Sequence, residues 1–416
     1  MNTIANYDIK EIVEKFGSPL YVYDAEQLRL NYSKLKNALN KFYPNNHIHF
    51  SVKANSNLKI LEIFKNLGAG ADCSSPNELR LAKVAGFSNS NTLYTGNYES
   101  YDDLSFVSEN DVKLNLDDLN SFKRLIKFKV PERISFRINP GIGRGGFEGI
   151  TTAGSDAKFG IPYEKAFEAY KFAKEAGVKR FGIHMMTGSN NLEPYYFAEV
   201  VDKLMMIAGD LFPQLGIVPE YFDIGGGQGV PYYDDEKELN VELMAELVAR
   251  VFKEKNEKFG FGEPELILEP GRYLAANAGY LITSVTGIKE GYKKFVGLDA
   301  GMGTLVRPSM YGAYHRSYIY GKVKTELEKV NLCGQICENS DIFAKNQLLP
   351  KVQEGDILIF RDAGAYGYTM ASVYNNRTRP AEVLLEKDQT IQIRKREVFE
   401  DMLRLYPDKI KSEFKL

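Results

Sequence analysis

Three separated segments carry groups that could act together in chemistry on an amine. An apolar run, His-Phe-Ser-Val-Lys-Ala-Asn (49–55), contains one lysine, Lys53. A triple glycine occupies 225–227, and Glu-Pro-Gly-Arg occupies 269–272. An amine can bond to an aldehyde, glycine amides can bind a phosphate, and a carboxylate can pair with a ring nitrogen. Together these groups predict a pyridoxal phosphate (PLP) site, whereas a single strand-end lysine is usually only solvated.

The glycines and the acid each have a simpler interpretation. Gly225, Gly226 and Gly227 follow an apolar run, and their bare backbone amides can approach a phosphate closely. A triple glycine alone is usually just a turn. Glu269 ends another apolar run and could form an ordinary surface ion pair, but its place in Glu-Pro-Gly-Arg favours a role opposite the ring nitrogen. There it would keep the nitrogen protonated.

Composition excludes several classes of function. The chain has 416 residues, 44% hydrophobic and 26% charged, with a net charge of -2, as expected for a soluble protein of about two domains. There is no basic excess for nucleic acid, and no long apolar run for a membrane. Three cysteines and four histidines, without metal-site spacing, predict no metal and no disulfide framework. The start of the chain lacks the apolar core of a signal peptide, which predicts a cytoplasmic protein.

Strand-like and helical patterns alternate between about residues 45 and 285. The predicted strands are 49–52, 69–73, 92–94, 113–116, 133–138, 180–185, 221–224 and 265–268, and the predicted helices include 58–67, 76–85, 163–176 and 242–255. About eight strand–helix units match the size of a (β/α)8 TIM-type barrel in an α/β protein. An open doubly wound sheet is the alternative. The glycine-rich segment 141–149 is expected to be a long loop.

The sequence pattern changes after about residue 285. Short strands separated by turns predict an all-β domain, a barrel or sandwich, and helical periodicity is scarce. The strand predicted at 20–23 is assigned to this β domain, ahead of a helix at 25–42. We therefore expect a connecting segment at 1–40, a PLP-binding barrel at 41–285 and a β domain at 286–416.

Many short stretches, in order along nearly the whole chain, resemble the PLP-dependent decarboxylases of the alanine-racemase fold, and among them the diaminopimelate decarboxylases. These stretches are 21–24, 51–55, 223–227, 269–272, 299–302, 307–311, 337–338, 364–367, 374–375 and 379–382. The resemblance implies decarboxylation of meso-diaminopimelate to L-lysine, with PLP supplying the electron sink that the reaction needs.

The resemblance also implies roles for individual residues. Lys53 would attach the cofactor and then move protons. Ser189, Arg272 and Tyr374 would join the glycines around the phosphate. Arg307 and Tyr311, with Arg272 and Tyr374 nearby, would bind the substrate, because the planar fork of arginine suits its distal carboxylate.

Two further residues would come from a second subunit of a homodimer with shared active sites. The resemblance implies that Cys337 donates a proton near the reacting carbon and that Glu338 contacts the distal amine. Taken alone, Cys337 would be a small buried hydrophobic residue. Its neighbour Glu338 favours the functional interpretation.

The chain departs from the family pattern in two places. The family usually has His-x-His-Ile-Gly-Ser-Gln where this chain has His-Met-Met-Thr-Gly-Ser-Asn (184–190), so Met186 replaces a histidine that stacks on the cofactor ring. A thioether can pack on an aromatic face but carries no proton. His184 alone could be a core residue. The segment 146–160 also lacks the family's usual histidine, although Lys-Phe-Gly (158–160) fits.

These departures leave other functions open. A sister decarboxylase could act on another amino acid, perhaps one that is conjugated or carrier-bound. A non-catalytic regulatory homologue is a third possibility, but the retention of Lys53, Glu269, Cys337 and Glu338 argues against it. The pair Cys337–Glu338 also argues against an amino-acid racemase.

Overall fold

The computed structural model describes residues 1–141, 153–154, 156–323 and 326–414. They form two compact units, one of residues 27–277 and one of residues 1–26 with 278–416. Most of the glycine-rich segment 141–149, and much of 146–160, lies outside the described residues. No described helix combines the length and apolarity needed to cross a membrane.

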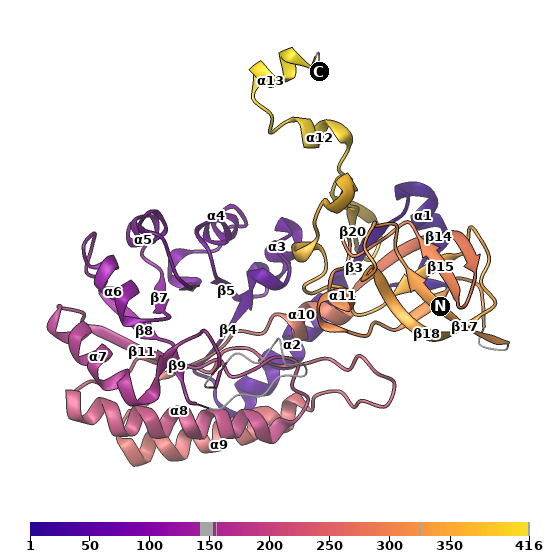
Figure 1. Cartoon of the computed structure of the whole chain (residues 1–416). Coiled ribbons are helices and arrows are strands. Elements are labelled where there is room, and N and C mark those ends of the chain that lie inside the picture. The colour runs from indigo at the N-terminus through magenta and orange to yellow at the C-terminus, as the bar shows by residue number, and fades with distance from the viewer. Residues whose placement is uncertain (142–152, 155, 324–325, 415–416) are drawn as a thin grey trace. The chain divides into compact units, whose positions relative to one another are not determined.

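The first unit is a closed barrel of eight parallel strands (Figure 1). In chain order they are β4 (Asn46–Ser51), β5 (Gly70–Cys73), β6 (Thr92–Gly96), β7 (Lys113–Leu116), β8 (Arg133–Phe136), β11 (Arg180–His184), β12 (Tyr221–Asp223) and β13 (Glu265–Leu268). β13 pairs with β4 and so closes the ring. The predicted (β/α)8 barrel is confirmed, and the open doubly wound sheet is excluded.

Helices before, between and after the strands cover the barrel. They are α2 (Ala25–Phe42), α3 (Leu58–Asn66), α4 (Pro76–Val84), α5 (Tyr101–Ser108), α6 (Leu119–Leu125), α7 (Ala166–Glu175), α8 (Pro194–Leu215), α9 (Val241–Phe259) and α10 (Arg272–Ala275). The long helices α8 and α9 lie side by side in Figure 1. Both end at a glycine in the left-handed conformation, Gly216 and Gly260, where other residues would be strained. A short parallel pair, β9 (Ile138–Asn139) with β10 (Ile161–Pro162), accompanies the barrel.

The second unit is built on a nine-stranded sheet. Its strands are β3 (Leu20–Asp24), β14 (Gly279–Glu290), β15 (Lys294–Leu298), β16 (Ser317–Ile319), β17 (Leu327–Cys333), β18 (Ile342–Pro350), β19 (Ile357–Phe360), β20 (Ala381–Leu385) and β21 (Thr390–Arg394). The N-terminal strand β3 pairs with both β14 and β20, so its predicted place in the β domain is confirmed. Apolar residues from both ends of the chain, including Ile9, Val22, Ile282 and Val383, share one core.

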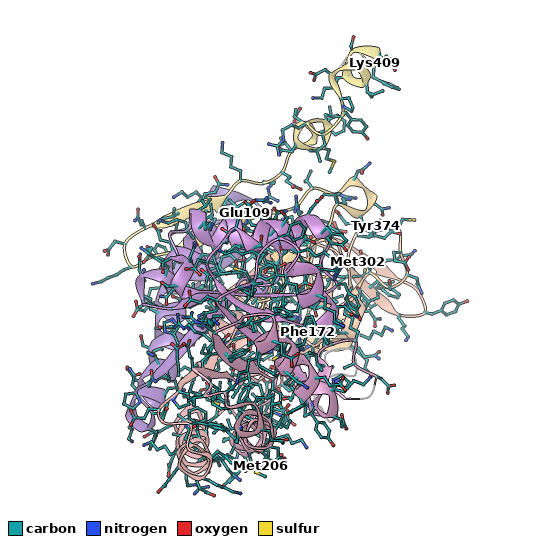
Figure 2. The ribbon with its side chains drawn as sticks, turned by 90° about the vertical axis from the view of Figure 1, so that its left-hand side faces the viewer. Glu109, Phe172, Met206, Met302, Tyr374 and Lys409 are labelled. Atoms are coloured by element: carbon teal, nitrogen blue, oxygen red, sulfur yellow. The ribbon has the colours of Figure 1, made fainter. Side chains whose placement is uncertain are left out.

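Short elements complete this unit. They are β1 (Thr3–Ile4), β2 (Tyr7–Asp8), α1 (Ile9–Phe16), α11 (Arg307–Tyr311), α12 (Phe399–Leu403) and α13 (Asp408–Glu413). Within the unit, α12 and α13 extend away from the sheet, and Lys409 marks α13 in Figure 2.

Candidate active site

Lys53 lies at the carboxyl end of a barrel strand. β4 ends at Ser51, and one turn of 3-10 helix, Val52–Ala54, carries the lysine. Its Nζ donates to Oδ2 of Asp72 at 2.9 Å, and Asp72 is fully buried at the corresponding position of β5. Ser51 Oγ lies 2.8 Å from the same carboxylate oxygen. The lysine side chain is 44% exposed, so an amine held by a buried acid remains accessible to a small molecule.

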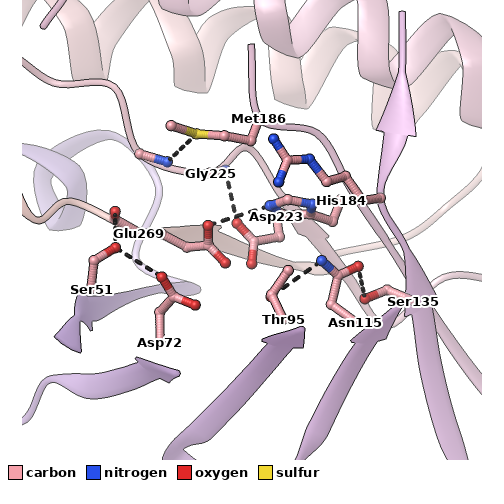
Figure 3. A network of polar contacts seen from close by, with 12 residues as sticks. Ser51, Asp72, Thr95, Asn115, Ser135, His184, Met186, Asp223, Gly225 and Glu269 are labelled. Carbon is pink, nitrogen blue, oxygen red and sulfur yellow. Dashed lines mark hydrogen bonds and ion pairs between the residues drawn. The ribbon is translucent and has the colours of Figure 1, made fainter. Parts of the chain in front are cut away.

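Glu269 follows β13 and is 5% exposed. Its Oε2 lies 3.3 Å from Nε2 of His184, at the end of β11 (Figure 3). Burial by itself raises the pKa of Glu269, but His184 and then Lys53 offset that effect and lower this pKa to about 2. The carboxylate is therefore ionised at neutral pH. Its other oxygen, Oε1, is buried and meets no N–H or hydroxyl donor among the described residues, although Asp223 shares a hydrogen bond with Glu269 when its own carboxyl is protonated. A protonated ring nitrogen would satisfy this oxygen, so Glu269 fits the cofactor that the sequence predicts.

A second buried acid, Asp223, accompanies Glu269. The ligand atoms of His184, Asp223 and Glu269 lie within 4.8 Å of one another. Burial and the negative charge of Glu269 raise the pKa of Asp223 well above its usual value. Asp223 Oδ1 accepts the N–H of Gly225 at 2.9 Å. The two acids thus have opposite pKa shifts, which favours one stable negative charge at Glu269.

The triple glycine forms a turn that has no room for side chains. Gly225 and Gly227 have φ values of 68° and 102°, which other residues adopt only under strain. A Cβ on Gly226 would lie 2.4 Å from the carbonyl oxygen of Glu269. Neighbouring protein atoms therefore pack so closely against these three positions that only glycine fits the turn. A phosphate is bound by backbone N–H groups, and because those of Gly225 and Gly226 are donated to Asp223 and Met186, Gly227 supplies the amide that the turn can offer.

Met186 lies against this turn. Its Sδ accepts the N–H of Gly226 at 3.2 Å, and a Cβ on Gly225 would come within 2.8 Å of the same sulfur. Figure 3 shows Met186 beside Gly225. The thioether is partly buried. The residue that replaces the family histidine is therefore fixed by the glycine turn.

Arg272 begins α10 and is also buried, at 6% exposure. Its guanidinium donates to Ser189 Oγ at 3.2 Å and to the Tyr232 hydroxyl at 2.9 Å. The structure thus brings together two residues that the sequence assigned to the cofactor phosphate, Ser189 and Arg272. Tyr232 was missed because no motif surrounds it.

The remaining predicted residues belong to the second unit. Arg307 is the first residue of α11 and is 2% exposed, and Tyr311, partly buried, ends the same helix. Cys337 is exposed, which excludes the alternative of a buried hydrophobic residue. Its N–H donates to Asn375 Oδ1 at 2.6 Å, so the segments carrying Cys337 and Tyr374 lie together.

Glu338 and Tyr374 are both exposed within this unit, and Figure 2 labels Tyr374. Glu338 Oε1 accepts hydrogen bonds from the N–H of Ser340 at 3.3 Å and from its Oγ at 3.2 Å. A carboxylate held this way is ordered at the surface. The barrel unit therefore holds every predicted cofactor residue except Tyr374, and the β unit holds every predicted substrate residue except Arg272.

Sequence reasoning did not single out Asp72, Asp223 or the buried cation Arg137. Arg137 lies just beyond β8, 7% exposed, and its Nε is 4.0 Å from Asp117 Oδ1. The sequence does contain a signal for the two acids, because each is an isolated charge near the end of an apolar strand. In a parallel barrel such strand ends meet at one face, where charged residues are usually functional.

Comparisons with known proteins agree with this geometry. Residues 28–276 match the family model described as the pyridoxal-binding domain of pyridoxal-dependent decarboxylases. The diaminopimelate decarboxylase of Methanothermobacter thermautotrophicus is 41% identical over 404 residues, covering 96% of this chain and 94% of the relative. That of Thermoplasma acidophilum is 37% identical, covering 96% of each. A crystal structure of the diaminopimelate decarboxylase from M. jannaschii in complex with L-lysine superposes with a TM-score of 0.89 at 34% identity, covering 98% of this chain and 96% of that chain.

Proposed function

The chain belongs to the family of pyridoxal-dependent decarboxylases, and on this premise we propose that it decarboxylates meso-diaminopimelate to L-lysine and CO2, with a proton replacing the lost carboxylate on Cα and PLP as the cofactor. The substrate assignment rests on sequence similarity to several diaminopimelate decarboxylases over nearly the whole chain. When bound, PLP would supply the electron sink that loss of the carboxylate from Cα requires. The protein must orient the substrate, keep the ring nitrogen protonated and return a proton to Cα.

The barrel residues divide the work of holding the cofactor. Lys53 supplies the amine, and Asp72 fixes that amine at 2.9 Å. Glu269, ionised and buried, would pair with a protonated ring nitrogen through Oε1, next to the buried acid Asp223. Ser189, Arg272 and the N–H of Gly227 bind the phosphate, where Arg272 adds a positive charge, while the N–H groups of Gly225 and Gly226 are donated to Asp223 and Met186.

The β-unit residues are proposed to select the substrate. Arg307 and Tyr311 bind the distal carboxylate, with Arg272 and Tyr374 completing the substrate site. Glu338 pairs with the distal amine, and Cys337 donates the proton to Cα. The exposure of Cys337 and Glu338 supports the proposal that they act in the active site of a second subunit in a homodimer.

We also propose that the enzyme works in the cytoplasm. The three cysteines, Cys73, Cys333 and Cys337, are all free. Free thiols are typical of a reducing compartment. The proposed proton donor Cys337 needs such a compartment, because its exposed thiol would otherwise be open to oxidation.

One observation favours a second candidate, a sister decarboxylase for a larger amino acid. Met186 stands where the family has a ring-stacking histidine, and its flexible side chain differs in shape and charge from an imidazole. If this change alters the substrate entrance, the substrate could be a conjugated or carrier-bound amino acid.

The test is a measurement of CO2 release by the purified holoenzyme. Meso-diaminopimelate, L-lysine, L-ornithine and an acylated diamino acid are compared at equal concentrations. Formation of L-lysine from meso-diaminopimelate, with little turnover of the others, supports the proposal. Release of CO2 from the acylated substrate alone would establish the second candidate instead.

A further inference from the structure

Arg307 is oriented by a histidine that the family motifs did not single out. Nη1 of Arg307 lies 2.9 Å from Nε2 of His315, and the two side chains are 2% and 3% exposed. The helix α11, which Arg307 begins, ends at Gly312 with a φ of 63°. This left-handed glycine reverses the direction of the chain. His315, eight positions after Arg307, can therefore reach the guanidinium of Arg307.

The other ring nitrogen of His315 fixes its protonation. Nδ1 lies 2.9 Å from the carbonyl oxygen of Arg361. A carbonyl can only accept a hydrogen bond, so Nδ1 carries the proton. A guanidinium can only donate, so Nε2 must present its lone pair to Arg307. Both contacts are satisfied only by a neutral ring protonated at Nδ1.

The sheet holds this ring in place. His315 lies just before β16, and Arg361 follows β19 directly. The two strands are antiparallel, with Ser317 opposite Phe360, and the N–H of Arg361 donates to the carbonyl of Arg316 at 2.9 Å. Because strand pairing fixes both the carbonyl and the histidine backbone, the imidazole has one orientation available. A rigid acceptor of this kind can orient a flexible side chain.

We propose that His315 is a positioning residue that sets Arg307 to receive the distal carboxylate of the substrate. The proposal rests on the function proposed above, because Arg307 has its role there. A neutral acceptor orients the guanidinium without adding a negative charge to it, whereas a carboxylate at position 315 would compete with the substrate. The planar guanidinium can then bind a substrate carboxylate through two parallel hydrogen bonds.

Two variants of the holoenzyme separate positioning from packing. His315→Phe keeps a ring but removes the acceptor. His315→Gln can place its Oε1 near the position of Nε2 and so restores an acceptor. We expect His315→Phe to raise the KM for meso-diaminopimelate roughly tenfold or more, with kcat changed by less than about threefold, since a hydrogen bond to a charged group is lost. We expect His315→Gln to return the KM to within a few-fold of the wild type.

Two kinetic outcomes would overturn the proposal. One is an unchanged KM in a folded, PLP-loaded His315→Phe variant. The other is a Gln variant with the same KM defect as the Phe variant, because the defect would then reflect packing and not the acceptor.

A measurement on the wild type keeps the proposal testable even if the Phe variant does not fold. The chain has four histidines, so a 15N spectrum of histidine-labelled holoenzyme is simple, and the His315→Gln variant assigns the signal of His315. We expect a protonated Nδ1 and an unprotonated Nε2 near pH 7. A proton on Nε2, or a doubly protonated ring, would exclude the acceptor role. If meso-diaminopimelate is not a substrate, the wild-type assay alone shows it, while this spectrum still reports on the pair of Arg307 and His315.

Discussion

Lys53 and Asp72 form an ion pair across two neighbouring barrel strands, with Nζ 2.9 Å from Oδ2. The pair is asymmetric, because the lysine side chain is 44% exposed and the aspartate is fully buried. Burial and the charge of Glu269 raise the pKa of Asp72, and Lys53 opposes that shift. Buried Asp72 therefore holds the amine of Lys53 in place, while that amine remains accessible to a small molecule that enters from solvent.

The first prediction is that Lys53 is the attachment point of the cofactor. Borohydride reduction of the holoenzyme should fix PLP on the peptide that contains Lys53, because its amine is the one held at the site. Peptide mass spectrometry measures the result, and Lys53→Ala serves as the control without label. A label on a different lysine would remove this residue from its proposed role.

The second prediction concerns the anchor of the lysine. Asp72→Asn should still bind PLP, since the glycine turn and Arg272 are unchanged, but turnover should fall roughly tenfold or more. The reason is that an amide oxygen can still accept a hydrogen bond from the amine but lacks the negative charge that strengthens it. Steady-state kinetics measures the loss, and the borohydride label confirms that the cofactor remains attached. Wild-type turnover in this variant would show that the ion pair has no catalytic importance.

The third prediction is that Glu269→Gln retains PLP but loses about a hundredfold or more in turnover. An amide cannot keep the ring nitrogen protonated as a buried carboxylate does. Comparison of kcat with the cofactor content from absorbance tests this. A variant with near-normal activity would exclude the proposed role of Glu269.

The fourth prediction concerns the pH dependence of stability of the PLP-free protein. The native pKa of Glu269, about 2, is below its ordinary value of 4.5, so ionised Glu269 stabilises the fold fully above about pH 4.5. That contribution is lost as the pH falls from 4.5 towards 2. The shift corresponds to at most about 3 kcal/mol. Urea unfolding should therefore show Glu269→Gln destabilised at about pH 7, with a smaller difference at about pH 3. A difference that stays constant with pH would contradict the lowered pKa.

The fifth prediction is that the active sites are shared. Lys53→Ala and Cys337→Ala proteins should each be inactive. After subunit exchange, half of the dimers would be hybrids with one intact site, so about a quarter of wild-type activity should return. The exchange is verified by mass spectrometry of differently tagged subunits. If exchange occurs and no activity returns, Cys337 does not act across subunits.

The sequence alone determined the elements that short-range patterns encode. Apolar runs bounded by glycine and polar caps identified all eight barrel strands and the helix at 25–42, because strand and helix periodicities are local. The edge strand β18 was missed, since its polar centre, Lys345, Asn346 and Gln347, breaks the alternation that marks a strand. The motifs around Lys53, Glu269 and the glycines are runs of consecutive residues, so they too can be recognised without the fold.

Only the tertiary structure decided what surrounds those motifs. Asp72, Asp223, His184 and Glu269 come from four strands, and closure of the barrel places their carboxyl ends at one face whatever their separation in the chain. The charge state of Glu269 depends on this convergence, because burial and His184 act in opposite directions on its pKa. The pairing of Arg307 with His315 likewise depends on strand pairing that fixes the Arg361 carbonyl. Spacing along the chain does not encode through-space contacts of this kind, so only the folded backbone defines them.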